Sequence, residues 1–233
     1  MKRLLLIGCM VLGMATAAMS QARKVQRLPY VDQRQWHYGF FLGLHTQDLK
    51  LWNSGLANNG EEWYADTPDY SPGFTVGVLG ELYLTRHFAL RIQPSIAFGD
   101  KKVVFKEQQQ GETYSQDVKS VYALLPVDLK FSAERFNNHR PYIVVGVMPA
   151  YDFVKTKAKP VKLNAPDCYL EVGLGCDFYL KNFKLIPELK FSFGLTDVLT
   201  RNRPDLAEPE MKKYAQTMTK ARSRMISLLF YFE

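Results

Sequence analysis

Residues 168–195, CYLEVGLGCDFYLKNFKLIPELKFSFGL, decide the fold because they show the same alternation twice. In each half an apolar residue occupies every second position, and polar, charged or glycine residues lie between. A period of two that continues for about a dozen residues indicates a β-strand and not a helix. Strands of soluble sheets are commonly about 5–6 residues long, whereas a tilted strand that crosses a bilayer needs about 9–11. The stretch therefore predicts two transmembrane strands with one face toward lipid and the other toward a polar interior.

The same alternation recurs elsewhere in the chain and predicts six further strands. They are residues 36–46, 73–84, 88–98, 119–131, 141–151 and 223–232. Long polar connections, at 47–72, 99–118, 152–167 and 196–222, alternate with short ones. Outer-membrane barrels have long loops outside the cell and short turns in the periplasm. The sequence therefore predicts an all-β fold, an eight-stranded antiparallel transmembrane β-barrel of the outer membrane at residues 36–233, with both termini periplasmic.

Two of the long connections and the strand ends carry further signals. Residues 99–118 contain the strand-like Val103-Val104-Phe105 and a turn at Gln110-Gly111, so the third and fourth strands are expected to extend there as a protruding hairpin. The charged connection at 196–222 is expected to be partly helical around residues 206–220. Aromatic residues near strand ends are expected in interfacial girdles, namely Trp36, Tyr38, Phe98, Phe131, Tyr142, Phe178, Phe183 and Phe230.

Residues 1–20 have the three parts of a secretory signal peptide, which is cleaved from the mature protein. Lys2 and Arg3 form the positive part, residues 4–14 the apolar part, and residues 15–17 a small-residue cleavage site. An alternative interpretation takes residues 6–9, LIGC, as a lipobox, which would make Cys9 a lipidated N-terminus. Residues 21–35 are expected to form a mobile, solvated extension on the periplasmic side, with partner docking as the alternative.

The charge balance argues against a nucleic-acid partner, and the positions of the cysteines exclude a disulfide. The net charge of +7 includes Lys2 and Arg3 and is therefore about +5 after cleavage. This excess is mild and no basic helix accompanies it, so no nucleic-acid partner is expected. Cys168 and Cys176 lie on one expected strand, about 27 Å apart at ~3.3 Å per residue. That separation excludes a disulfide between them.

Charged residues on the inward faces form the most informative polar set. The expected lumen network consists of Glu81, Arg91, Asp128, Lys130, Glu171, Asp177, Glu188 and Lys190, with Lys184 as a further inward cation. The interior of an eight-stranded barrel is only wide enough for side chains to fill it. Buried charges must pair and form hydrogen bonds, because an unpaired one is very costly. We therefore expect a structural salt-bridge network, with a proton or ion path as the alternative.

No catalytic, cofactor or metal site is expected. Acyl transfer or proteolysis needs a nucleophile with a positioned base. His45 lies in the first expected strand and could approach a serine or aspartate of a neighbouring strand, but nothing in the sequence singles out that partner. No His, Cys and carboxylate cluster has metal-ligand spacing, and no phosphate-binding loop occurs.

Basic residues are frequent in two of the expected external loops. They are Lys155, Lys157, Lys159 and Lys162 in one loop, and Lys212, Lys213, Lys220, Arg222 and Arg224 in and after the other. Ordinary solvation is expected for them. The alternative is contact with lipopolysaccharide phosphates or an acidic partner.

Several short segments resemble a known family. They are YALLPVDLK at 122–130, PYIVVG at 141–146, EVGLGCD at 171–177, GLTDV at 194–198 and the aromatic Phe230-Tyr231-Phe232. The whole mature chain resembles the PorT-like outer-membrane β-barrel proteins of Bacteroidota. The chain departs from the common pattern of such barrels at Glu233, since they end on an aromatic residue. The resemblance implies a role in type IX protein secretion and in maturation of secreted and cell-surface proteases, through secretion-system partners in the outer membrane or periplasm.

The functional hypothesis is therefore a non-enzymatic barrel that acts through protein partners while it contacts the lipid bilayer. Its external surfaces would be the loops at 47–72, 99–118 and 196–222, with residues 21–35 on the periplasmic side. The alternatives are a small outer-membrane enzyme or lipid-modifying barrel, and a passive structural barrel or narrow channel.

Overall fold

The computed structural model describes residues 25–53, 57–58, 61–66, 71–107, 113–154, 161–200 and 217–233, which form one antiparallel sheet. A 3-10 turn, η2 (Val31–Gln33), precedes the strands. The strands of the ring are β1 (Trp36–Asn53), β4 (Ser71–Tyr83), β5 (Phe88–Ile92), β6 (Ser95–Glu107), β7 (Thr113–Leu124), β8 (Val127–Ser132), β9 (His139–Asp152), β10 (Pro166–Tyr179), β11 (Lys184–Gly194) and β12 (Met218–Phe232). Two short strands, β2 (Ala57–Asn58) and β3 (Glu61–Asp66), lie between β1 and β4 in the chain.

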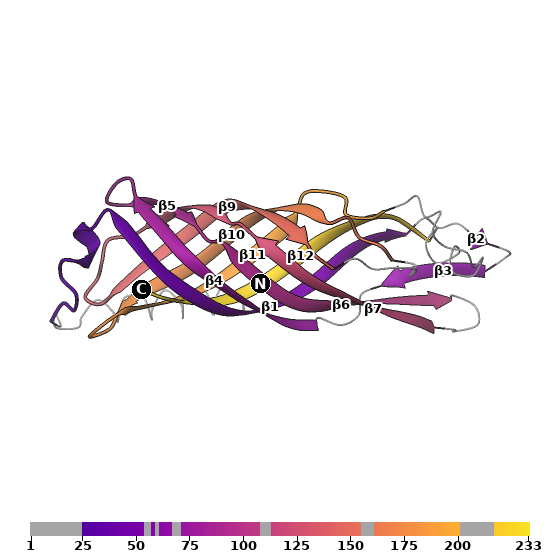
Figure 1. Cartoon of the computed structure of the whole chain (residues 1–233), viewed down its shortest axis with the longest axis horizontal. Helices are drawn as coiled ribbons and strands as arrows, with labels where there is room; N and C mark the ends of the chain where they lie inside the picture. The colour runs from indigo at the N-terminus through magenta and orange to yellow at the C-terminus, as the bar shows by residue number, and fades with distance from the viewer. Residues whose placement is uncertain are drawn as a thin grey trace, which may run out of the picture.

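The sheet closes into a ring, which confirms the predicted barrel. β12 pairs with β11 on one side and with β1 on the other, and the β1–β12 register runs from Phe40↔Phe232 to Asn53↔Met218. Figure 1 shows the tilted strands wrapped around one long axis. The ring has eight positions, because β5 with β6 fills one position and β7 with β8 fills the next. Closure leaves no open edge with unpaired N–H and C=O groups in hydrocarbon.

Proline divides two of the predicted strands. The segment expected at 88–98 breaks at Gln93-Pro94 into β5 and β6, and the segment expected at 119–131 breaks at Leu125-Pro126 into β7 and β8. Proline has no backbone N–H and cannot donate to the ladder. Both proline carbonyls still accept, from Val78 N at 3.1 Å and from Gln93 N at 3.0 Å, so the wall stays continuous across the breaks.

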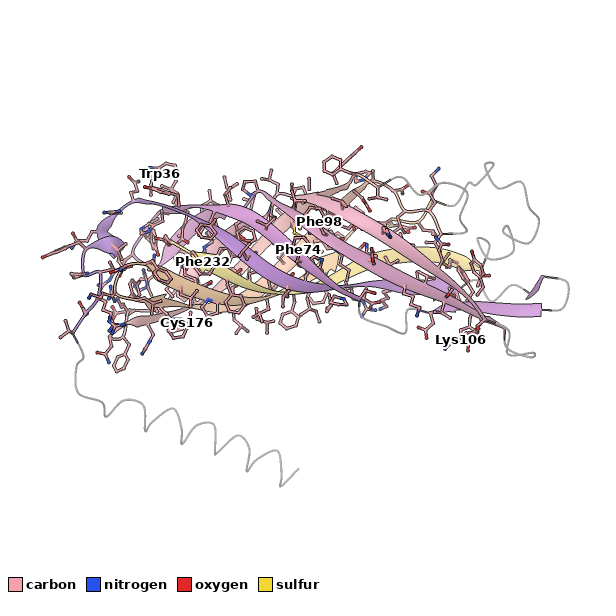
Figure 2. All side chains as sticks on the ribbon, turned by 60° about the horizontal axis from the view of Figure 1, so that its bottom comes forward. Trp36, Phe74, Phe98, Lys106, Cys176 and Phe232 are labelled. Atoms are coloured by element: carbon pink, nitrogen blue, oxygen red, sulfur yellow. The ribbon has the colours of Figure 1, made fainter. Side chains whose placement is uncertain are left out.

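The two faces of the wall differ as the alternation predicts. Outward side chains of β1 such as Leu42 and Leu44 are 50% and 63% exposed, whereas the intervening His37, Phe41 and His45 are buried. The outer wall is apolar: Phe74 and Phe98 stack on it with ring centroids 4.8 Å apart (Figure 2). Cys168 and Cys176 are free cysteines, as expected. Among the described residues no helix is long and apolar enough to cross a membrane.

At the end far from the C-terminus the strands continue beyond the predicted limits. β1 reaches Asn53 and β12 begins at Met218, so residues 47–53 and 218–222, expected in loops, are paired strand. The helix expected around 206–220 is therefore wrong at 218–220, and its residues 206–216 lie outside the described residues. The paired strands of the protruding hairpin are confirmed, since β6 and β7 project together with β3 beyond the ring (Figure 1). The turn expected at Gln110-Gly111 lies outside the described residues.

The apolar belt of the outer wall predicts a large effect of a charge at its middle. Leu228 lies in the outward row of β12 and pairs with Leu44 of β1. Leu228→Arg should lower the free energy of unfolding by about 2–4 kcal/mol, because the cation would face hydrocarbon. Asn182→Arg, in the exposed turn between β10 and β11, should change it by less than about 1 kcal/mol. Urea unfolding of the barrel in phospholipid vesicles measures both; equal effects would contradict a lipid-facing wall.

Candidate functional site

The barrel interior is the first candidate site, because the eight predicted lumen residues lie together inside it. Glu81, Arg91, Asp128, Lys130, Glu171, Asp177, Glu188 and Lys190 are each at most 2% exposed. Strand pairing places several of them directly opposite one another. Glu81 of β4 is opposite Arg91 of β5, and Arg91 is opposite Asp128 of β8. The strand register therefore gathers charges that lie far apart in the chain.

Arg91 is the cation at the centre of this network. Its Nε donates to Glu81 Oε2 at 2.6 Å, and its NH1 group donates to Glu188 Oε2 at 2.7 Å. The guanidinium also lies over the Tyr142 ring, 4.7 Å from the centroid. Both carboxylates and the guanidinium are fully desolvated. Arg91 thus connects β4, β5 and β11 across the lumen.

Two lysines extend the network to either side of Arg91. Lys130 Nζ is 3.3 Å from Glu81 Oε1 and 3.0 Å from Asp177 Oδ2. Lys190 Nζ is 2.7 Å from Asp128 Oδ2, 3.4 Å from Glu171 Oε2 and 3.5 Å from Glu188 Oε1. Each cation therefore has at least two carboxylate partners, as buried charges require.

Tyrosine and glutamine residues complete the network, and the position predicted for one of the tyrosines is wrong. Tyr142 was expected in an interfacial girdle, but it is 4% exposed and its hydroxyl donates to Glu188 Oε2 at 2.6 Å. Tyr231 donates to Gln93 Oε1 at 2.8 Å and lies 3.0 Å from Glu188 Oε1. Along β9, Pro141 and Ile143 are exposed and Tyr142 between them is buried. This alternation is the sequence signal that identifies Tyr142 as a lumen residue.

Glycine makes room for these long side chains. A Cβ atom at Gly175 of β10 would overlap the hydroxyl of Tyr142, and one at Gly146 of β9 would overlap the carboxylate of Asp128. A cavity beside the network, lined in part by Gln93 and Lys190, has a volume of about 20 Å³. A space of that size holds about one water molecule. Side chains therefore fill the middle of the barrel.

The end with the long connections is closed by an apolar cluster. Inward residues of β1, β6, β7 and β12 pack there on Val161, Val198 and Leu199 from two connections; they are Leu49, Val103, Phe105, Val118, Met218 and Ala221. Gln116 holds Val161 through two hydrogen bonds of 3.0 Å, to its N–H and its C=O. The connections thus fold into the mouth of the extended barrel.

The opposite end carries a polar closure made by Glu233 and by the segment that leads into β1. Lys184 Nζ lies 2.8 Å from Glu233 Oε1, and the same carboxylate contacts His37 Nδ1. Residues 25–35, expected to be mobile, instead lie against the barrel, because Asp32 accepts from the Tyr179 hydroxyl at 2.6 Å and from Arg135 at 3.2 Å. Residues 21–24 and the signal-peptide region, with Cys9, lie outside the described residues.

The remaining candidate for chemistry is His45. Its Nδ1 is 2.8 Å from Thr75 Oγ1 and its Nε2 is 3.0 Å from Gln47 Nε2. Among the described residues no group of three or more His, Cys, Asp or Glu has the arrangement of a metal site.

The buried network predicts a large difference between an inward and an outward arginine. Arg91→Met leaves Glu81 and Glu188 without their main cation and should lower the free energy of unfolding by about 3–5 kcal/mol. Arg86→Met breaks an exposed pair with Glu134 at 3.7 Å and should cost less than about 1 kcal/mol. Denaturant unfolding of the two variants provides the comparison. Equal costs would show that Arg91 is not held in a desolvated network.

The closure around Glu233 predicts a pH dependence. Burial opposes ionisation of Glu233, but its hydrogen bond with His37 and the charge of Lys184 outweigh burial and lower the pKa of its carboxyl. Because the pKa of Glu233 is lower in the folded than in the unfolded protein, its ionised carboxylate stabilises the fold above the unfolded-state pKa of about 4.3. This stabilisation is lost as the pH falls through the folded-state pKa.

Glu233→Gln should therefore reduce stability at pH 7 and flatten the loss of stability below about pH 4.3. Unfolding in denaturant at a series of pH values measures this. Glu134→Gln, which alters an exposed carboxylate, should leave the profile as in the wild type. A Glu233→Gln profile parallel to the wild-type one would contradict the stabilising role of this closure.

The chain is similar to one family model and to solved structures. The family model described as outer membrane protein beta-barrel domain matches residues 19–200. Among solved structures, the chain is similar to the outer membrane protein OprG from Pseudomonas aeruginosa, with a TM-score of 0.44 and 14% identity, over 83% of this chain and 94% of that chain. No curated protein matches the sequence.

Proposed function

The chain belongs to the outer membrane protein β-barrel domain family, and we propose that it serves type IX protein secretion as a sealed scaffold. It is an outer-membrane protein with an eight-stranded ring. In the proposed role it has no enzymatic activity, binds partner proteins of the secretion system, and supports maturation of secreted and cell-surface proteases.

The observation that carries this proposal is the filled interior. Salt bridges occupy the middle of the barrel, and about 20 Å³ remains free beside them. An apolar cluster closes one end and the Glu233 cluster lies at the other. A barrel without room for cargo or solute in its lumen acts through its surfaces. This favours a scaffold over a channel.

The surfaces available for partners lie at both ends. We assign the end with long connections to the outside and the end with short turns and both termini to the periplasm, as in other barrels of this kind. The external surface is then the hairpin of β6 and β7 with β3 beside it. The periplasmic surface includes residues 25–35, which Arg135 and Tyr179 hold in place.

The assignment to type IX secretion is supported by the PorT-like segments. Residues 122–130 and 141–146 form the wall around Asp128, Lys130 and Tyr142, and residues 171–177 contribute Glu171 and Asp177. The resembling segments thus coincide with the filled lumen.

Deletion of the gene tests the proposed role. We expect unprocessed protease cargo to accumulate in the periplasm while other outer-membrane proteins stay normal. Wild-type protein should restore export. A variant in which a short turn replaces residues 100–118 should insert, shift in gel mobility on heating and yet fail to restore export, because it lacks the external hairpin.

The other outcomes decide between the remaining functions. Normal export in the deletion strain would refute the secretion role. Altered lipid or lipopolysaccharide structure with normal export would favour a lipid-modifying enzyme. Export restored by the hairpin variant would place the partner surface elsewhere and contradict the external-hairpin assignment.

A further inference from the structure

Four cationic side chains gather on the outward face of β1 and β12, just beyond the apolar belt. β1 and β12 lie side by side in Figure 1, and their register pairs Asp48 with Arg224, Lys50 with Arg222, and Trp52 with Lys220. The residues between them on β12, Ala221 and Ser223, are buried inside. Alternation therefore places Lys50, Lys220, Arg222 and Arg224 on one outer surface, which we call the basic ladder.

The basic ladder contains a like-charge pair. Lys50 and Arg222 are directly opposite on neighbouring antiparallel strands, an arrangement that is destabilising unless an anion compensates it. The buried Nε of Arg222 has no hydrogen-bond partner among the described residues. Trp52 lies between two of the cations, with Lys50 Nζ 4.9 Å and Lys220 Nζ 5.6 Å from its ring centroid.

Two carboxylates lie beside the basic ladder, and one of them forms an ion pair with Arg224. Asp48 Oδ2 is 3.8 Å from Arg224 NH2, and its Oδ1 accepts from the backbone of Leu49. Asp197 uses Oδ1 for the backbone N–H groups of Leu199 and Ala221. Among the described residues the four cations of the ladder therefore outnumber the two carboxylates beside them, and a ligand with more than one negative charge fits this surface.

A largely apolar groove lies beside Arg224, the cation of the ladder nearest the apolar belt. It has a volume of about 130 Å³ and is lined by the apolar Phe191, Phe193 and Ile226 and by the polar Thr46, Asp48 and Arg224. Phe193 pairs with Arg224, and Phe191 pairs with Ile226. Arg224 and Ile226 are successive outward residues of β12, so the cationic and apolar side chains are about 7 Å apart along the strand. The groove lies on the lipid-facing wall, where an acyl chain is the available occupant.

We propose that the basic ladder and this groove form a binding site for a phosphorylated glycolipid of the outer leaflet. The phosphates on the sugar head group bind Lys50, Arg222 and Arg224, and one acyl chain occupies the groove beside Phe191 and Ile226. Cations placed just above a hydrocarbon belt match a lipid whose phosphates lie just above its chains. The site is separate from the β6–β7 hairpin and from residues 25–35, the surfaces proposed above for secretion partners, and its test does not depend on them.

The test compares lipid binding by two double variants with equal charge loss. Purified protein in detergent is titrated with diphosphorylated lipid A, with dephosphorylated lipid A and with inorganic phosphate, and the lipid-bound fraction is read by native mass spectrometry. Arg222→Gln/Arg224→Gln removes two cations of the ladder. Arg86→Gln/Lys181→Gln removes two exposed cations from turns at the opposite end.

Wild type should bind the diphosphorylated lipid at least about tenfold more tightly than the dephosphorylated one, since each cation near an anionic surface contributes roughly a fivefold factor. The ladder variant should lose this preference, and the turn variant should keep it. Heat-shifted gel mobility confirms that each variant is folded. Equal binding of both lipids, equal loss in both variants, or displacement of the lipid by equimolar inorganic phosphate would overturn the proposal.

Discussion

The structure depends on one constraint, that every backbone N–H and C=O in the hydrocarbon region must be paired within the protein. The seam between β1 and β12 meets it, because the last strand returns to the first over most of its length. Where Pro94 and Pro126 remove a donor, their carbonyls still accept and the wall stays closed. Closure in turn forces each strand to have one face in lipid and one in the lumen.

A closed ring of eight strands leaves an interior that side chains must fill. Inward charges are then fully desolvated, and each needs a partner across the lumen; Arg91 reaches both Glu81 and Glu188 for this reason. Glycines such as Gly175 provide space where Tyr142 crosses. The side chains that fill the interior stabilise the ring and also block the passage of solutes through the lumen. Recognition is therefore left to the outer wall and to the two ends.

Alternation along the strands was enough to predict the ring and the inward side of Glu81, Arg91 and Lys190. It could not predict which carboxylate meets which cation, because that depends on register across strands. Tyr142 was misassigned, since an aromatic near a strand end suits a girdle as well as a lumen. The sequence predicts a loop at residues 47–53 because the outward face turns polar at Asp48 and Lys50, where the apolar alternation ends. Docking of residues 25–35 depends on distant Arg135 and Tyr179, which no local pattern reveals.

The most direct test of a sealed scaffold is the ionic conductance of the purified, folded protein in a planar lipid bilayer. A lumen filled by the Arg91, Lys130 and Lys190 network and closed at both ends should give no channel steps above the bare bilayer in 1 M KCl. Conductance steps that disappear when the protein is unfolded would contradict this account. They would show that ions pass where the structure places salt bridges.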